Sequence, residues 1–527
     1  MKRTKLQSFK LLIILFAAIY LASCSGSDKN LIIVPEEASV VASFNIKNLI
    51  SKGNIKEIQE TDFFQEEVLN ENDVLIELFN KPGKSGINFA KDAFIFTYKD
   101  ESTITGVIIP LSNKKKFEEF LDDFMDEIDA DLDIEEEDDY SYAEIEGSTI
   151  LAWNKKLACI LNGYFYGDDD ALEDVAEELM TNKSKNSFLA SDAYKEFKKI
   201  GKDINVVVNN KEAELFDISE MLEEADIDEE MNIDFITVGA EFNRGSIDVE
   251  FNYVYDDESE KFINKYDPMK GSPDSKTINM LPGDKVVAAM SASFDLDKII
   301  AFLDDHDDFA DEVEEEFEEE NNMKLKDLLS KLGTDGVGVI HGMKEEGYEP
   351  IYSFAVSVSD AKLLDDFLNN NEDEGMEIEK TGSYYTLTKS SYSYYSSTPQ
   401  KSYSYMGVKD GVLYGTNSEE YVKKISKGIS DNNLGSTNVG KQLKNKAYNI
   451  CINLNVDELP EDMLKMVGHE LDDAVETMES TVELFDNLSA SADFYSGKIK
   501  IELTSKEDNS LALILANLVD DIESEME

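Results

Sequence analysis

Residues 110–123 read PLSNKKKFEEFLDD, and residues 357–370 read SVSDAKLLDDFLNN, which align with them without a gap and place Ser112 on Ser359. Three further pairs of segments match in the same order along the chain: 34–46 with 281–296, 78–88 with 328–338, and 240–251 with 492–503. Four matching blocks at nearly constant spacing indicate an internal duplication. The chain therefore predicts two tandem homologous domains.

Each half mixes helical and strand patterns. The segment after Ser112 predicts an amphipathic helix, because Phe117, Phe120 and Phe124 fall on one helical stripe. The segment around Gly245 predicts a β-hairpin, because apolar and polar residues alternate after the glycine. Alternating patterns outnumber fully apolar runs, which favours antiparallel sheets with one covered face. The predicted fold class is α+β, with each domain a largely antiparallel sheet that carries helices on one face.

The N-terminus has the pattern of a bacterial lipoprotein signal peptide. A basic start precedes an apolar core at residues 11–21, and the core closes at Leu21-Ala22-Ser23-Cys24. The core is shorter than the roughly 20 apolar residues that a membrane-spanning helix needs. We expect residues 1–23 to be removed and the Cys24 thiol to carry a diacylglycerol, although an uncleaved anchor is an alternative. Ser25 favours the outer membrane, and either a periplasmic or a surface-facing orientation fits.

The remaining boundaries follow from composition. Small polar residues at 24–30 predict a tether, which precedes a first domain at residues 31–255. Pro268, Gly271 and Pro273 interrupt a charged stretch and predict a linker at residues 256–277. The second domain is then expected at residues 278–527.

Charge and cysteine content exclude several classes of protein. The chain has 112 acidic and 50 basic residues, a net charge of −62, so it lacks the clustered cations that nucleic-acid binding needs. Anionic lipid headgroups are also expected to repel it. Besides Cys24 it contains only Cys159 and Cys451, which both lie in apolar, strand-like runs. Buried free thiols are the favoured interpretation, with a disulfide between the two as the alternative.

The second half carries a Tyr/Ser-rich insertion at residues 383–405, where the first half is shorter and acidic. Tyrosines often supply contact area at interfaces, so we predict that an extended hairpin here contacts a protein or glycan partner. The alternative is a solvated low-complexity loop. The residues assigned to this contact are Tyr392, Tyr394, Tyr395, Tyr403 and Tyr405.

Catalytic and metal-binding patterns fail in detail. His469-Glu470-Leu471-Asp472-Asp473 resembles the zinc-protease helix but lacks the second histidine. The chain has three histidines and no Gly-x-Ser-x-Gly motif, which argues against a Ser/His/Asp hydrolase. The acidic run from Asp129 has Ile134 where a calcium loop needs glycine. We therefore predict no catalytic residue and no cofactor, with weak Ca²⁺ binding by acidic side chains as the single exception.

The lipobox at Cys24, the Val34-Pro35-Glu36 opening and its counterpart Leu281-Pro282-Gly283-Asp284 resemble the Bacteroidetes lipoproteins grouped as domain of unknown function 4836. The resemblance covers nearly the whole mature chain. It implies an envelope-anchored protein of that phylum and carries over no functional residues. We predict a non-catalytic binding or scaffold protein of the cell envelope. A carboxylate-dependent hydrolase and an envelope assembly factor are the alternatives, and the latter predicts an exposed apolar patch.

Overall fold

The structure is a computed structural model of the chain. It describes residues 28–61, 64–65, 74, 78, 81–99, 102–127, 132–146, 148–163, 165, 171–213, 231–344, 349–370, 376–391, 400–429, 431–455, 459 and 484–526. The predicted signal peptide and Cys24 lie outside these residues. The described residues fall into two compact units. Unit 1 has the ranges Met1–Phe216, Ile233–Val254 and Ser505–Glu527, and unit 2 has Asp217–Asn232 and Tyr255–Thr504.

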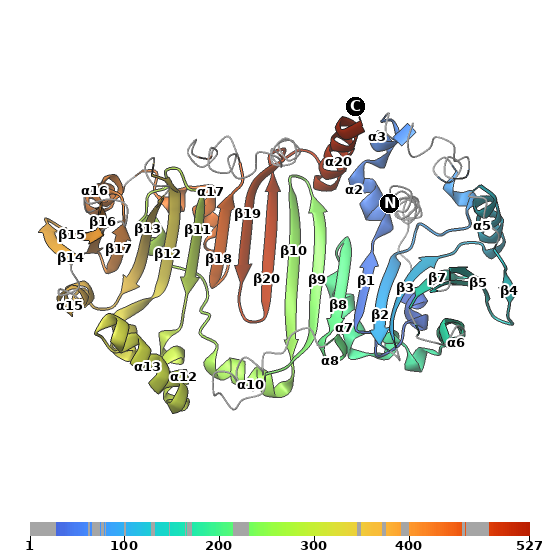
Figure 1. Cartoon of the computed structure of the whole chain (residues 1–527), viewed down its shortest axis with the longest axis horizontal. Helices are drawn as coiled ribbons and strands as arrows, with labels where there is room; N and C mark the ends of the chain where they lie inside the picture. Colours follow the sequence, from blue (N-terminus) through green and yellow to red (C-terminus); the bar gives the residue numbers. More distant parts are fainter. Residues whose placement is uncertain are drawn as a thin grey trace. The chain divides into compact units, whose positions relative to one another are not determined.

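Unit 1 is built on an antiparallel sheet with the strand order β4-β5-β6-β7-β3-β2-β1-β8-β9-β10 (Figure 1). Its strands are β1 Val40–Phe44, β2 Ala93–Lys99, β3 Thr103–Pro110, β4 Glu135–Glu136, β5 Ser141–Glu146, β6 Thr149–Trp153, β7 Leu157–Asn162, β8 Ile204–Asn209, β9 Ile233–Asn243 and β10 Ser246–Tyr255. Its helices are η1 Asp28–Ile33, α2 Ile46–Gly53, α3 Ile55–Gln59, η3 Pro82–Lys84, α5 Lys114–Glu127, α6 Ala171–Thr181, η4 Ser184–Asn186, η5 Phe188–Ala190, α7 Asp192–Ile200, α8 Asn210–Ala213 and α20 Ser510–Met526.

Unit 2 has an antiparallel sheet with the order β14-β15-β16-β17-β13-β12-β11-β18-β19-β20 (Figure 1). Its strands are β11 Ala288–Ser293, β12 Leu332–Met343, β13 Pro350–Val358, β14 Met376–Thr381, β15 Tyr384–Ser391, β16 Gln400–Lys409, β17 Val412–Thr416, β18 Tyr448–Asn453, β19 Phe485–Ala492 and β20 Ser496–Leu503. Its helices are α10 Asp257–Tyr266, α11 Ser275–Asn279, α12 Leu296–Asp305, α13 Asp307–Asn321, α14 Leu325–Lys331, α15 Leu363–Asn370, α16 Glu419–Lys427, η6 Leu434–Ser436 and α17 Asn438–Gln442.

The two sheets correspond strand for strand, from β4 and β14 at one end to β10 and β20 at the other. A buried hydrogen bond recurs with them. Asn205 donates through Nδ2 to the Ser43 hydroxyl at 3.0 Å, and Asn449 donates in the same way to Ser291 at 3.1 Å. The structural counterpart of Ser43 is therefore Ser291, whereas the sequence blocks place it on Ser293. Two additional residues between strand and helix in the second half account for the shift.

The α+β class is confirmed, but helices cover both faces of the unit 1 sheet. One core contains Phe96, Ile108 and Cys159 of the strands with Leu179 of α6 and Phe197 of α7. A second core, on the other face, joins Leu151 and Trp153 of β6 to Phe117 of α5. The strands β6 and β7 are buried on both faces. Their sequences, TILAW and LACIL, are continuously apolar. Such runs indicate strands that are buried on both faces of a sheet, and not a sheet that is covered on one face only.

Each unit is completed by a helix from the other half of the sequence. The helix α20 follows β20 but belongs to unit 1, where it packs on α2. The helix α10 follows β10 but belongs to unit 2, where it packs on α12. The predicted linker 256–277 is therefore not a linker throughout, because it contains α10 and part of α11. The predicted second domain, 278–527, likewise contains a helix that folds with unit 1.

The last three residues of the predicted tether, 24–30, are part of η1, in which Asn30 and Leu31 are buried. Leu31 and Ile33 join the main core of unit 1. The rest of the predicted tether lies outside the described residues. Among the described residues, no helix combines the length and the apolar character that crossing a membrane requires.

Candidate functional site

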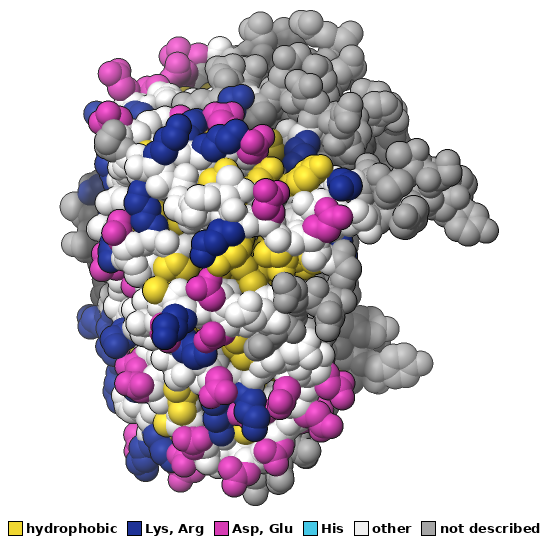
Figure 2. Space-filling model, turned by 90° about the vertical axis from the view of Figure 1, so that its left-hand side faces the viewer, with side chains coloured by type: hydrophobic (Ala, Val, Ile, Leu, Met, Phe, Trp, Pro, Cys, Tyr) yellow, Lys and Arg dark blue, Asp and Glu magenta, His cyan; other side chains and the backbone are white. Residues whose placement is uncertain are grey.

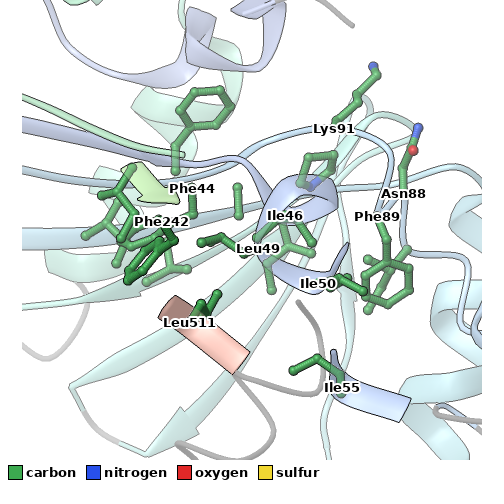
Figure 3. A pocket seen from close by; sticks show the side chains of 18 of the residues that line it. Phe44, Ile46, Leu49, Ile50, Ile55, Asn88, Phe89, Lys91, Phe242 and Leu511 are labelled. Atoms are coloured by element: carbon green, nitrogen blue, oxygen red, sulfur yellow. The ribbon is translucent and has the colours of Figure 1, made fainter. Parts of the chain in front are cut away.

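An apolar cavity of about 310 Å³ lies in unit 1, between one face of the sheet and the helices α2, α3 and α20 (Figure 3). The sheet contributes Phe44, Ile95, Val107, Ile109, Ile204 and Phe242. The helices contribute Ile46, Leu49, Ile50, Ile55, Leu511 and Leu515. Cavities of this volume with an apolar lining are typical of small-molecule binding sites. Its lining suits a small apolar molecule.

Strand alternation explains why these side chains point into the cavity. On β2, Ala93 and Ile95 line the cavity, while Phe96 and Tyr98 belong to the core on the opposite side. Val107 of β3 is the cross-strand partner of Ile95, so both lie on the same face. One face of the strand AFIFTYK therefore packs in the core, and part of its other face forms a wall of the cavity.

The helix α2 is held over the cavity by a buried carboxylate. Asp203 accepts the Lys52 ammonium at 2.6 Å and the Asn48 amide Nδ2 at 3.1 Å, both from α2. It also accepts the backbone N–H of Phe242 in β9 at 2.9 Å. The Asp203 side chain is only 2% exposed. One carboxylate thus joins a helix and a strand that both line the cavity.

The helix α20 is attached beside the turn between β9 and β10. Asn509 donates through Nδ2 to the Phe242 carbonyl at 3.0 Å, and the Gly245 N–H donates to the Asp508 carbonyl at 2.9 Å. Gly245 has φ +67°, and a Cβ atom there lies 2.7 Å from the Lys506 Cα. Only glycine permits both the turn and this close approach. The turn glycine predicted from the sequence therefore also positions the end of the cavity wall.

Two polar residues, Asn88 and Lys91, line the cavity, and their polar ends turn away from the apolar side chains (Figure 3). The Asn88 Oδ1 accepts the Ala90 N–H at 3.1 Å, which directs the Nδ2 group of Asn88 elsewhere. Within the described part of the chain, Lys91 makes no ion pair. The described lining contains no acidic side chain. The cavity thus combines an apolar interior with hydrogen-bond donors at one end.

The corresponding helix pair in unit 2 is packed differently. The rings of Phe262 and Tyr266 in α10 lie 5.0 Å apart, and Tyr266 lies 5.3 Å from Phe302 of α12. Phe302 in turn lies 4.3 Å from His306. Aromatic rings therefore fill the contact between α10 and α12. In unit 1 the contact between α2 and α20 is made by smaller groups, with Leu515 against Gly53.

The structure describes only some of the tyrosines that are predicted to contact a partner. Tyr392, Tyr394 and Tyr395 lie outside the described residues, between β15 and β16, which pair as an extended hairpin. Tyr403 is 44% exposed, but Tyr405 is 9% exposed and packs against Tyr384 in the core of unit 2. Tyr405 is therefore a core residue. Tyr403 lies two residues away on the same face of β16, but the pairing of β16 with β17 ends at Tyr405, and Tyr403 stays exposed.

One face of the unit 2 sheet carries a row of exposed apolar side chains. Ile452, Ile340 and Tyr352 are 36%, 39% and 37% exposed and are aligned across neighbouring strands through Ala288. Met290, on the same face of β11, is 48% exposed. Elsewhere, around the end of unit 2 that carries β14 and β15, lysines and acidic side chains are interspersed with hydrophobic groups (Figure 2).

A second concavity in unit 1, of about 360 Å³, is polar. Its carboxylates are paired, Glu196 with Lys199 at 2.6 Å and Glu250 with Lys202 at 3.2 Å. A carboxylate-dependent hydrolase needs one carboxylic acid that stays protonated, and a neighbouring lysine favours the ionised form instead. This concavity therefore lacks the charge arrangement that the hydrolase alternative requires.

A serine–histidine contact occurs in unit 2 but is inaccessible. His341 Nε2 lies 3.2 Å from the Ser353 hydroxyl, and His341 Nδ1 lies 3.0 Å from the Asp284 carbonyl oxygen. Both side chains are 1% exposed, and burial lowers the pKa of His341. No substrate reaches this pair, so we interpret it as a structural hydrogen bond. His469 lies outside the described residues.

Cysteine and metal predictions can be compared with the structure directly. Cys159 and Cys451 are buried free thiols, as the sequence favours. Burial raises the pKa of the Cys159 thiol, and burial with nearby carboxylates raises that of Cys451 to about 12. Both thiols are therefore unreactive. In the described ranges, no three or more His, Cys, Asp or Glu side chains are placed to hold a metal ion. Weak Ca²⁺ binding stays a prediction.

The fold and cavity define an α+β protein with an apolar cavity in its first unit. The chain belongs to the family described as domain of unknown function DUF4836, whose model matches residues 30–511. No curated protein matches the chain. Two solved structures, titled "Structure of crystal form III of TP0453" and "Structure of crystal form I of TP0453", are 10% identical to it. They match 47% and 46% of this chain and 92% and 88% of their own, with TM-scores of 0.26 and 0.25, which carry no argument about function.

Proposed function

We propose that this protein is a lipid-anchored, non-catalytic binding protein of the cell envelope, and that it binds an apolar ligand in the unit 1 cavity. The observation that carries the proposal is the apolar lining of a volume of about 310 Å³. At about 30 Å³ per water-sized group, that volume accommodates on the order of ten methylene-sized groups. The ligand is thus the size of a medium-length hydrocarbon chain.

The apolar lining favours an apolar occupant. The cavity is partly open to solvent, and its lining offers few hydrogen-bond partners to water that enters it. A hydrocarbon chain that takes the place of this water contributes about 0.8 kcal/mol for each buried methylene. In unit 2, aromatic rings fill the corresponding helix contact instead.

The ligand proposal is tested with the mature chain expected from the lipobox, carrying Cys24→Ser so that it has no acyl group of its own. The neutral fluorescent probe Nile red is titrated into it and displaced with 1-dodecanol. We expect saturable binding to one site. Val107→Phe, which places a ring in the cavity, abolishes that binding. The control Val206→Phe adds the same bulk to the same sheet face, at a residue that does not line the cavity.

Equal Nile red binding by the wild-type chain and by Val107→Phe contradicts the proposal, as does the absence of binding to either. Thermal unfolding of both variants establishes that they are folded. Because one ring substitution can disturb a sheet, Ile204→Phe at the other side of the cavity serves as a second blocking variant.

The location in the cell is part of the same proposal. The Cys24 lipobox supports lipid attachment, and Ser25 supports the outer membrane, facing either the periplasm or the surface. The family resemblance supports a bacterium of the Bacteroidetes. Labelled palmitate is expected in the wild-type protein and not in Cys24→Ala. Labelling of both proteins, or of neither, contradicts lipid attachment at Cys24.

The duplication is inferred on similar grounds. The common strand order and the recurring Asn–Ser hydrogen bond support two homologous domains that have exchanged their closing helices.

An envelope assembly factor is the second candidate, and the exposed row around Ile340 and Ile452 favours it. In that case Ile340→Ser with Ile452→Ser abolishes crosslinking to an envelope protein without lowering Nile red binding. Unchanged crosslinking contradicts this candidate.

A further inference from the structure

We propose that the cavity binds a single-chain amphiphile with a carboxylate head, whose hydrocarbon chain fills the apolar interior and whose carboxylate is held by Lys91 and Asn88. This inference rests on the proposed function and specifies the chemical class of the ligand. The cavity residues that carry it are Lys91 and Asn88 at one end and Val107, Ile95 and Leu515 along the interior.

The volume of the cavity limits the number of chains. Room for on the order of ten methylene-sized groups fits one medium-length chain and not the two chains of a phospholipid. The lining is apolar along the sheet and along α20, and it offers no hydrogen-bonding side chain other than those of Asn88 and Lys91. A ligand with polar groups along its length therefore leaves those groups unpaired, which costs binding free energy.

The polar end of the cavity favours an anion. A lysine ammonium is only a donor, and the Asn88 amide presents Nδ2 donors because its Oδ1 already accepts the Ala90 N–H. Donors of this kind select a head group that accepts hydrogen bonds. A charged acceptor forms the stronger bonds, since charge-assisted hydrogen bonds exceed neutral ones. An ammonium head group is repelled by the like charge of Lys91.

The local absence of acidic groups removes competition for Lys91. The chain has 112 acidic residues, yet the described cavity lining contains none. Other lysines of unit 1, such as Lys52 and Lys202, are paired with carboxylates. The neighbouring Asp92 is not among the lining residues, and burial and the negative charge of Asp28 raise its pKa. Lys91 is thus a cation beside an apolar cavity with no carboxylate of the described chain bonded to it.

The net charge of −62 opposes an anionic ligand only at long range. At physiological ionic strength, charges are screened over about 8 Å. The donors in direct contact with the head group therefore decide its binding.

The experiment compares three amphiphiles with the same twelve-carbon chain and different heads: dodecanoate, 1-dodecanol and dodecyltrimethylammonium. Each displaces Nile red from the Cys24→Ser mature chain below its micelle concentration. A charge-assisted hydrogen bond contributes enough that we expect dodecanoate to bind at least about tenfold more tightly than dodecanol. Dodecyltrimethylammonium is expected to bind more weakly than either.

Lys91→Gln is the decisive variant. It is expected to reduce dodecanoate affinity to that of dodecanol and to leave dodecanol unchanged. The matched control is Lys99→Gln, which removes the same charge from an exposed lysine at the other end of β2. It is expected to change neither affinity. Unchanged dodecanol binding also shows that Lys91→Gln is folded.

The outcomes separate the two proposals. If dodecanoate and dodecanol bind the wild-type chain equally, or if Lys91→Gln leaves their ratio unchanged, the carboxylate inference is wrong while the apolar site stands. If none of the three displaces Nile red, or if the probe binds Val107→Phe as well as wild type, the proposed function itself is wrong. A preference for dodecanoate that is lost specifically in Lys91→Gln supports both.

Discussion

Replacing Asp203 with alanine tests whether the carboxylate holds α2 and β9 together. The change removes the acceptor of three donors at once: the Lys52 ammonium at 2.6 Å, the Asn48 amide at 3.1 Å and the Phe242 N–H at 2.9 Å. Removing one partner of a buried ion pair typically costs about 3–5 kcal/mol. The unpaired Phe242 N–H alone accounts for about 1–3 kcal/mol of that. Because Lys52 is 24% exposed and gains some solvation, we expect a loss near the lower end of the range, about 3 kcal/mol.

The single tryptophan of the chain makes this measurable in unit 1 alone. Trp153 is fully buried in the core of unit 1, with its ring 6.1 Å from that of Phe117. Urea unfolding followed by Trp153 fluorescence therefore reports the free energy of unfolding of this unit. The control is Glu119→Ala, which breaks the exposed Lys115–Glu119 pair at 2.8 Å and is expected to have no measurable effect. If Asp203→Ala and Glu119→Ala unfold at the same urea concentration, the role assigned to Asp203 is wrong.

Three other predictions concern separate features. Burial and the nearby Asp28 raise the pKa of Asp92 from 3.8 to about 6, so the folded state binds the proton more tightly than the unfolded state does. Stability is therefore lost as pH rises from about 4 to about 6. At about 1.36 kcal/mol per pKa unit the loss is at most about 3 kcal/mol, and solvent screening reduces it to roughly half of that value. Asp92→Asn should accordingly stabilise unit 1 in urea melts at pH 7.5 and have little effect at pH 4, and equal effects at both refute the assignment. Gly245→Ala should lower the free energy of unfolding by about 1–2 kcal/mol for the left-handed backbone, and by a further amount for the clash with Lys506. Gly201→Ala, at φ +63° with no atom within 4 Å of the added Cβ, should show only the backbone cost. Equal losses of stability in urea melts argue against the close approach. Tyr403→Ser should weaken capture of an envelope partner without changing thermal stability, and Tyr405→Ser should lower stability as well; the reverse pattern contradicts the assigned exposures.

Local features of the fold were accessible from the sequence. Strand alternation and repeated blocks predicted the antiparallel sheets, and Gly245 was correctly assigned to a turn. Details that depend on neighbouring segments could not be predicted from the sequence. At the start of α5, the Ser112 hydroxyl donates to the Gly86 carbonyl, whereas the Asn113 side chain accepts the Lys116 N–H and caps the helix. Two polar residues at a helix start fit either role in sequence alone.

The cavity could not be predicted from the sequence, because its walls come from segments that are far apart along the chain. Phe44, Val107, Ile204, Phe242 and Leu511 converge only after the sheet has formed and α20 has returned to unit 1. The apolar run SLALILANL at residues 510–518 indicates a helix that packs on something, but periodicity does not identify its partner. The predicted boundary at residue 278 assigned residues 510–526 to the second domain, whereas α20 belongs to unit 1.

The central claim, that the unit 1 cavity holds a single-chain carboxylate, is tested most directly by native mass spectrometry of the protein purified from its own envelope without added lipid. We predict a bound species that dissociates on activation and has the mass and charge of one carboxylate with a medium-length hydrocarbon chain. We also predict that this species is absent from Val107→Phe and present in Val206→Phe. A wild-type protein that carries no such species, or a Val107→Phe variant that carries as much of it as wild type, contradicts the account.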